Sequence, residues 1–116
     1  MRWPVQTTAI FMVFGLASFG CAKAPVPTDS SASAIRAAEE LGATEVPRAS
    51  LYLQLAREEL EKATQLSEEG KDEEARSMLM RAEADAELAV LLAKEQAEKA
   101  EAQEAMERVH KLQVGR

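Results

Sequence analysis

The chain has 116 residues with 20 acidic and 14 basic side chains, which gives a formal net charge of −6 at pH 7. An acidic surface without a basic cluster excludes nucleic acid as a partner and excludes electrostatic docking on anionic lipid. The length fits a single small domain.

The first 20 residues have the layout of a bacterial secretory signal. Arg2 supplies a positive start, residues 9–16 form an apolar run, and small residues lie just before Cys21. An uncleaved membrane anchor is the alternative, but a spanning helix needs about 20 apolar residues and this run is shorter and interrupted. We therefore expect residues 1–20 to be a signal peptide that is cleaved between Gly20 and Cys21.

Cleavage would leave 96 of the 116 residues, with Tyr52 as the single aromatic side chain. Aromatic and branched side chains carry most of the area that a core buries, and small domains bury a low fraction of their surface. This composition predicts a small, elongated helical protein rather than a globule with a deep pocket.

Cys21 is the only cysteine, so the chain can form no intramolecular disulfide. Residues 16–21, Leu-Ala-Ser-Phe-Gly-Cys, resemble the lipobox of bacterial lipoproteins, although Ser18 and Phe19 depart from its usual pattern. In that class the cysteine is acylated through its sulfur and on its amine. The resemblance implies lipidation of Cys21 and, because Ala22 follows, an outer-membrane anchor facing the periplasm rather than an inner-membrane one. Ordinary cleavage that leaves a free thiol is the alternative.

Residues 21–28 are expected to form the lipidated N-terminus and an extended tether. Pro25 and Pro27 disfavour helix in the residues before them, so this stretch would act as a spacer between membrane and domain. The domain itself is expected to span 29–116.

Three helices are predicted in this domain from apolar residues that recur at helical spacing. Their expected ranges are about 30–41, 47–68 and 72–112. Asp29, Ser30 and Ser31 are candidate N-caps for the first helix, and Gly42 ends it. Pro47 suits the first turn of the second helix. A tight turn at Gly70 makes antiparallel packing of the second and third helices the expected outcome.

The predicted fold is all-α: an antiparallel helical hairpin with a short preceding helix and a long C-terminal helix that overhangs it. A leucine-bearing stripe on the second helix is expected to face an alanine-bearing stripe on the third, which lets two helices approach closely. The expected seam comprises Leu53, Ala56, Leu60, Ala63, Leu66, Ala75, Leu79, Ala82, Ala86 and Ala89.

Residues 70–75, Gly-Lys-Asp-Glu-Glu-Ala, followed by Leu79 and Ala82, resemble the inter-helix turn and second helix of a tetratricopeptide-type repeat. No second copy follows at about 34 residues. The resemblance therefore implies a single repeat-like hairpin, without the peptide groove that stacked repeats build.

A wider pattern resembles a family of short bacterial lipoproteins that share an uncharacterised helical domain. The pattern consists of the lipobox-like start, the proline-containing tether, Ala-Glu-Glu-Leu at 38–41, Ala-Arg-Glu-Glu-Leu-Glu-Lys-Ala at 56–63 and the turn Glu-Glu-Gly-Lys at 68–71. Some members carry an OmpA-like peptidoglycan-binding module after the domain. The resemblance implies an envelope location and no assigned activity. Because the chain stops at Arg116, we do not expect that module here.

Beyond about Lys94 the long helix is expected to lack an intramolecular partner, since the second helix can cover only about half of it. Ala102, Ala105, Val109 and Leu112 form an a/d-type seam there. A solvated helix that frays is the simpler interpretation, and a docking or self-association seam is the other.

No catalytic residue, metal site or cofactor is expected. His110 is the sole histidine, and no second metal-binding side chain accompanies it. Glu83, Asp85 and Glu87 point to different sides of a helix, so they cannot converge for acid–base chemistry without another element. The sequence also lacks a phosphate loop and a nucleophile motif.

The preferred hypothesis is a lipid-anchored, non-enzymatic envelope lipoprotein that acts as a helical structural or protein-interaction module in the periplasm, with an unknown envelope protein as partner and no small-molecule substrate. The alternative is a peptidoglycan-associated spacer resembling the small coiled-coil lipoproteins, which end in a wall-linked lysine. This chain ends at Arg116, so Lys111 would have to substitute. An enzyme is the third possibility.

Overall fold

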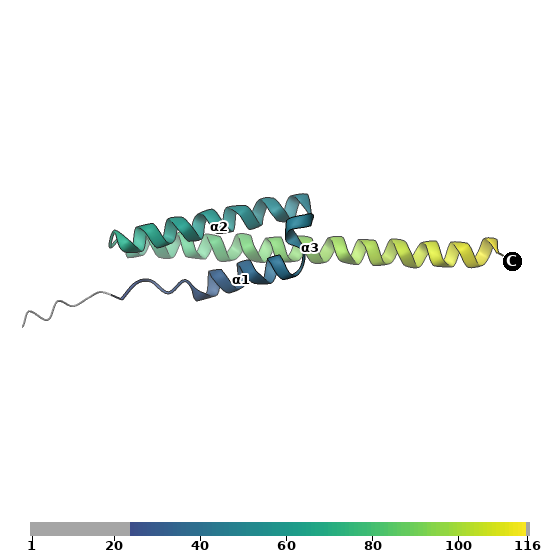
Figure 1. Cartoon of the computed structure of the whole chain (residues 1–116), viewed down its shortest axis with the longest axis horizontal. Helices are drawn as coiled ribbons and strands as arrows, with labels where there is room; N and C mark the ends of the chain where they lie inside the picture. Colours follow the sequence, from purple (N-terminus) through teal and green to yellow (C-terminus); the bar gives the residue numbers. More distant parts are fainter. Residues whose placement is uncertain (1–23, 116) are drawn as a thin grey trace, which may run out of the picture.

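The computed structural model describes residues 24–115, so the expected cleavage and lipidation site at Gly20 and Cys21 lies outside the described residues. Within this range the chain forms α1 (Asp29–Glu40), a 3₁₀ turn η1 (Ala43–Glu45), α2 (Pro47–Glu68) and α3 (Asp72–Val114). Figure 1 shows α1 and α2 lying along the first half of α3, while the second half of α3 projects alone. The predicted all-α fold with an overhanging C-terminal helix is confirmed.

The turn between α2 and α3 depends on Gly70, whose φ of 75° lies in the left-handed region. Its N–H donates to the Ser67 carbonyl (3.0 Å), and the next N–H, from Lys71, donates to the Leu66 carbonyl (2.8 Å). These two bonds form a Schellman motif, which satisfies carbonyls that the end of a helix leaves free. Since α3 begins at Asp72, the chain reverses within a few residues and the two helices run antiparallel.

Three details at helix ends differ from the sequence-based expectation. The prediction of Asp29, Ser30 or Ser31 as the N-cap is wrong, because the cap of α1 is Thr28. Asp29 is the first helical residue, where its charge complements the helix dipole. Gly42, with φ 76°, leads into the unpredicted turn η1, in which Ala43 is fully buried. α3 continues to Val114, two residues beyond the expected end.

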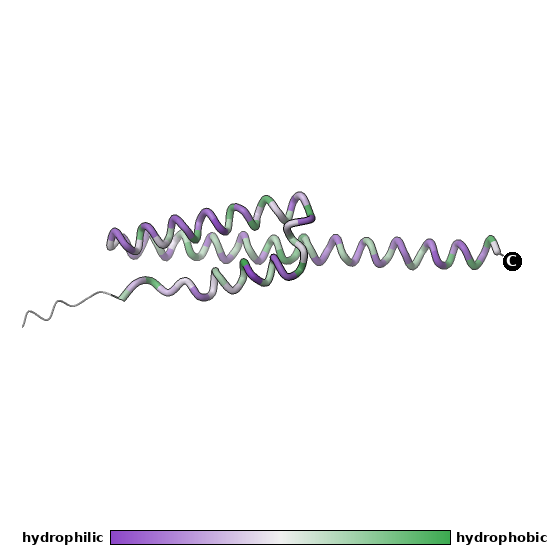
Figure 2. Tube along the Cα trace, viewed as in Figure 1, coloured by the Kyte–Doolittle hydropathy of each residue, from purple (hydrophilic) through white to green (hydrophobic). Residues whose placement is uncertain are grey.

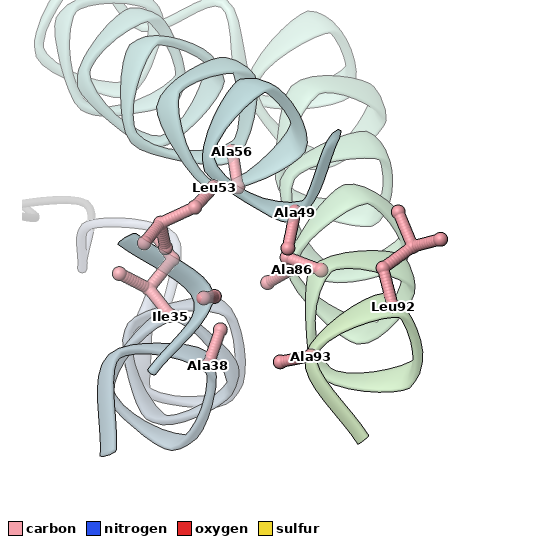
Figure 3. Packing of buried hydrophobic residues seen from close by; sticks show 10 residues of the cluster. Ile35, Ala38, Ala49, Leu53, Ala56, Ala86, Leu92 and Ala93 are labelled. Atoms are coloured by element: carbon pink, nitrogen blue, oxygen red, sulfur yellow. The ribbon is translucent and has the colours of Figure 1, made fainter. Parts of the chain in front are cut away.

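The larger core cluster lies where α1, α2 and α3 meet, at the end of the hairpin away from Gly70. Most of its members are alanines, so the three helix backbones approach closely. Figure 3 shows side chains from all three helices gathered in this space. The cluster consists of Ile35, Ala38, Ala43, Ala49, Leu53, Ala56, Ala86, Ala89, Leu92 and Ala93.

A second, smaller cluster lies beside the hairpin turn and includes a residue of the expected tether. Val26 is 8% exposed and packs in the cluster that contains Leu66 and Leu79. Its N–H donates to the Ser67 hydroxyl at 3.0 Å. From Val26 onward the tether expected at 21–28 is therefore attached to the hairpin instead of being a free spacer, because its one large apolar side chain gains burial beside the turn.

Hydrogen bonds fix α1 along α3. The hydroxyl of Ser31, which is 2% exposed, donates to the backbone carbonyl of Leu79 at 3.0 Å. Ser30 donates to the Glu83 carboxylate one turn further along α3. α1 therefore starts at the hairpin-turn end and runs in the same direction as α3 (Figure 1). The chain enters the fold at one end of the rod, and the overhang leaves it at the other.

Candidate interaction surfaces

The side chains expected at the hairpin seam occupy the interior of the fold. Leu60 is partly buried and contacts both core clusters. The other nine are buried: Leu53, Ala56, Ala63, Leu66, Ala75, Leu79, Ala82, Ala86 and Ala89. Intramolecular packing occupies these residues, so a surface that binds another molecule must be sought elsewhere on the fold.

An open groove runs between α1 and α3 on the side away from α2. One depression in it has a volume of about 520 Å³ and is lined by small side chains of α1 and by side chains of α3. Its lining includes Ser33, Ala34, Ala37, Glu87, Val90 and Leu91. A second depression of about 470 Å³ lies nearer the hairpin turn, and the two share Ser30. Met80, at 72% exposed, and Leu91, at 61%, present large apolar side chains along this groove.

The overhang is the second surface. Every residue from Lys94 to Gly115 is exposed, including the expected seam residues Ala102 and Ala105. Large apolar side chains remain in contact with solvent: Met106 is 64% exposed, Val109 53%, Leu112 74% and Val114 71%. Figure 2 shows hydrophobic and hydrophilic segments alternating along this half of α3. Exposed apolar side chains that gather on one face of a helix can mark a binding surface, so the overhang is the second candidate.

Glu59, which the sequence analysis did not single out, lies in the contact between α2 and α3. One of its carboxylate oxygens, Oε1, accepts a bond from Arg81 Nε at 3.0 Å, and its side chain is 13% exposed. The other oxygen, Oε2, is buried without a hydrogen-bond partner among the described residues. The sequence signal was present, because Glu59 follows Ala56 by three residues and precedes Ala63 by four, within the buried stripe.

The surroundings of Glu59 favour its protonated form. Burial raises the pKa of the Glu59 carboxyl above its ordinary value, the charge of nearby Asp85 raises it further, and Arg81 opposes the shift. Two carboxylates only accept hydrogen bonds, so Glu59 and Asp85 can bond to each other only when one carries a proton. Of Glu83, Asp85 and Glu87, it is Asp85 that lies close to a second carboxylate, because the packing of α2 against α3 brings Glu59 next to it.

This shift has a defined effect on stability. Because the folded-state pKa of Glu59 is raised, the folded protein binds the proton more tightly than the unfolded chain does. The contribution of Glu59 to stability is therefore fully present below the ordinary glutamate pKa. It is lost as the pH rises through the raised pKa, and above that the contribution no longer changes.

Two structural findings bear on the class of site. Among residues 24–115 there is no group of three or more His, Cys, Asp or Glu side chains placed to hold a metal ion. The helices in this range also include none with the length and hydropathy of a membrane span.

Comparison with known proteins identifies the family of the chain. A family model described as a domain of unknown function (DUF4398) matches residues 28–107. The chain belongs to the DUF4398 family. The DUF4398 match takes in α1, α2 and α3 as far as Glu107, so it includes more than half of the overhang as well as the hairpin. Neither the curated proteins nor the solved structures contain a match to the chain.

Proposed function

We propose that this DUF4398 protein is a lipid-anchored, non-enzymatic module of the bacterial cell envelope, held at the outer membrane through Cys21 and presenting its helices to a protein partner in the periplasm. The observation that carries the proposal is the attachment of Val26 beside the hairpin turn, where its N–H bonds to Ser67. If Cys21 is acylated, this attachment puts the hairpin turn at the membrane end of the rod and the overhang at the other end.

The distances support such an arrangement. Cys21 is five positions before Val26, and an extended chain spans at most about 3.3–3.6 Å per residue, so Cys21 can lie no more than about 18 Å from Val26. α3 has 43 residues and is about 65 Å long at 1.5 Å per residue. Acyl chains on Cys21 would therefore hold the turn close to the bilayer, with the exposed apolar residues of the overhang at the far end of the rod.

The character of the open groove supports a binding role over a catalytic one. Its larger depression is lined mainly by Ser, Ala, Val and Leu, with Glu87 as the single titratable side chain. General acid–base catalysis needs a positioned group whose pKa is matched to its task, supported by a second polar group. Small and apolar side chains instead suit the approach of another helix.

The length of α3 also favours a second candidate, a spacer between the membrane and peptidoglycan. In that case a fraction of the protein would remain covalently joined to muropeptides after the wall is digested, and Lys111 would be the attachment residue. Muropeptide analysis separates the two functions, because an interaction module leaves no such adduct.

Replacing Cys21 by Ser tests the anchor. The wild-type protein is expected in the membrane fraction, with a mature mass that includes acyl chains and with incorporation of a labelled palmitate analogue. Cys21→Ser should lose the label and leave the membrane fraction. Lys23→Ser, a substitution in the same tether that spares the sulfur, should behave as wild type. Wild-type protein that carries no acyl group, or Cys21→Ser that stays with the membrane, would contradict the proposal.

A further inference from the structure

We propose that α3 pairs with α3 of a second copy of this chain in an antiparallel orientation, so that the overhang of each copy covers the groove between α1 and α3 of the other. The pairing goes beyond the proposed function and does not depend on lipidation. It rests on the position, register, charge and length of a stripe of exposed apolar residues on α3.

The stripe lies on the outer side of α3. At about 100° per residue, the residues of the stripe point roughly opposite to Ala82, Ala86 and Ala93, which pack inside the fold. The exposed apolar residues of the groove and those of the overhang therefore lie on one face of a single helix, as two segments separated by the charged residues Lys94, Glu95 and Glu98. The stripe consists of Met80, Ala84, Leu91, Ala102, Ala105, Val109 and Leu112.

The stripe is complementary to itself when it is reversed. In this register Met80 lies opposite Leu112 of the second copy, and Leu91 lies opposite Ala102. The two residue numbers in each pair sum to 192 or 193, and a nearly constant sum is what a two-fold axis perpendicular to the helices requires. Ala84 falls opposite Val109 in the same register. Each pair occurs twice, once on each side of the axis, so one surface serves both copies.

Charge selects this orientation over the parallel one. A parallel, in-register pair would place Glu87 against Glu87 and Glu98 against Glu98 along the contact, and like charges at such positions repel. In the antiparallel register Glu87 faces Ala105, and Glu98 lies between Lys94 and Glu95 of the second copy. Glu95 is already paired with Lys99 of its own helix at 2.5 Å. Near the two-fold axis each Glu98 therefore meets one opposite charge and one like charge that is neutralised within its own chain.

A second opposite-charge contact flanks the stripe further from the axis. Glu83, which borders the depression nearer the hairpin turn, comes close to Arg108 of the second copy in the same register. Arg108 is in the exposed overhang, where its guanidinium Nε bonds only weakly to the backbone of its own helix, at 3.4 Å from the Glu104 carbonyl. Its charge is thus available to a carboxylate on another chain.

The length of the overhang also matches the length of the groove that it would cover. From Lys94 to the end of α3 at Val114 the overhang has 21 residues, about 32 Å of helix. The two depressions together border α3 from Arg76 to Leu91, about 24 Å by the same rise per residue. In this register residues 102–114 of the overhang lie opposite residues 79–91 of the second copy, so the overhang covers most of the groove.

The arrangement has a consequence for a membrane-bound pair. The two hairpin turns lie at opposite ends of the dimer, about 80 Å apart along α3 at 1.5 Å per residue. If Cys21 of each copy is anchored, the rod lies along the membrane with an attachment at each end. Two acylated cysteines, one at each end of the dimer, would hold it at the membrane more firmly than a single acylated cysteine holds a monomer.

Site-directed disulfide formation tests both the pairing and its direction. In the full chain with Cys21→Ser, two variants of different tagged mass carry Leu91→Cys and Ala102→Cys, respectively. Mixed and oxidised, they should give a disulfide-linked heterodimer, because the two positions face each other across the two-fold axis. Leu91→Cys mixed with Leu112→Cys is the matched control. These positions are out of register by about 15 Å of helix, beyond the reach of a disulfide.

A second measurement does not depend on cysteine chemistry. Sedimentation of the Cys21→Ser chain should give a species of twice the monomer mass, and Val109→Glu should raise the dimer dissociation constant at least about tenfold. Ala100→Glu, an equally exposed position on the opposite side of the overhang, should change it less than about twofold. Both residues are exposed in one chain, so neither change disturbs its fold.

Three outcomes would overturn the proposal. They are a monomer at all concentrations up to about 100 µM, a weak affinity by interface standards; equal effects of Val109→Glu and Ala100→Glu; and efficient disulfide formation by Leu91→Cys alone, which would indicate a parallel pair.

Discussion

Replacing Leu53 by Ala should remove a large part of the stability of the fold. Leu53 is 1% exposed and is the largest fully buried side chain among the described residues. The substitution removes three carbons, about 2.4 kcal/mol of transfer free energy at about 0.8 kcal/mol each. The surrounding side chains are mainly alanines, which cannot move into the space, so a cavity term adds to this and the total loss should be about 3–4 kcal/mol.

Urea unfolding followed by circular dichroism at 222 nm measures this change at a single protein concentration. The midpoint should fall with little change in slope, and the thermal midpoint should fall by about 12–25 °C for a domain of this size. Leu51→Ala is the matched control, since Leu51 is in the same helix but is 56% exposed. Leu51→Ala should lower the free energy of unfolding by less than about 1 kcal/mol. Equal losses from the two variants would refute the placement of Leu53 at the centre of the core.

Two further substitutions test the helix contact and the turn. Glu59→Gln should raise the unfolding free energy at neutral pH by about 1 kcal/mol, because an amide can donate to Asp85 and gains more than the exposed Arg81 contact loses. It should also abolish the loss of stability as the pH rises through the raised pKa of Glu59. Glu61→Gln, on the solvent face of α2, should change neither the unfolding free energy nor its pH dependence. If Glu59→Gln keeps the pH dependence of the wild type, Glu59 is not the group whose pKa is raised. Gly70→Ala should destabilise the fold by about 1–2 kcal/mol through its left-handed φ alone, since an added Cβ meets no atom within 4 Å. Gly70→Asn should recover part of this in thermal melts, and equal melting of Gly70→Ala and wild type would show that the turn tolerates a side chain.

The helices and their pairing were predictable because their signals are local. Pro47 starts α2, Gly70 closes it, and three acidic residues open α3. The period of the apolar residues identified the face that each helix buries. The expected seam was therefore derived from spacing alone, and the overhang followed from comparing the lengths of two helices.

Other features could not be derived in this way, because they depend on residues far apart in the chain. Val26 bonds to Ser67, 41 positions away, and Ser31 bonds to Leu79, 48 positions away. Periodicity shows that a residue faces inward but does not name the neighbour it meets there. Spacing alone puts Glu59 in the buried stripe of α2, but only the packing of α2 against α3 brings it close to Asp85.

The sequence by itself determined three helices, their order, the turn between the last two and the unequal lengths that leave half of α3 uncovered. Those properties depend on backbone preferences and on spacing within one segment. Only the tertiary structure decided the side of α3 on which α1 lies, the attachment of Val26 at the hairpin turn and the groove that remains open beside α1. Each of these is set by the direction in which one helix approaches another, and that direction is a property of side chains from several segments packing together.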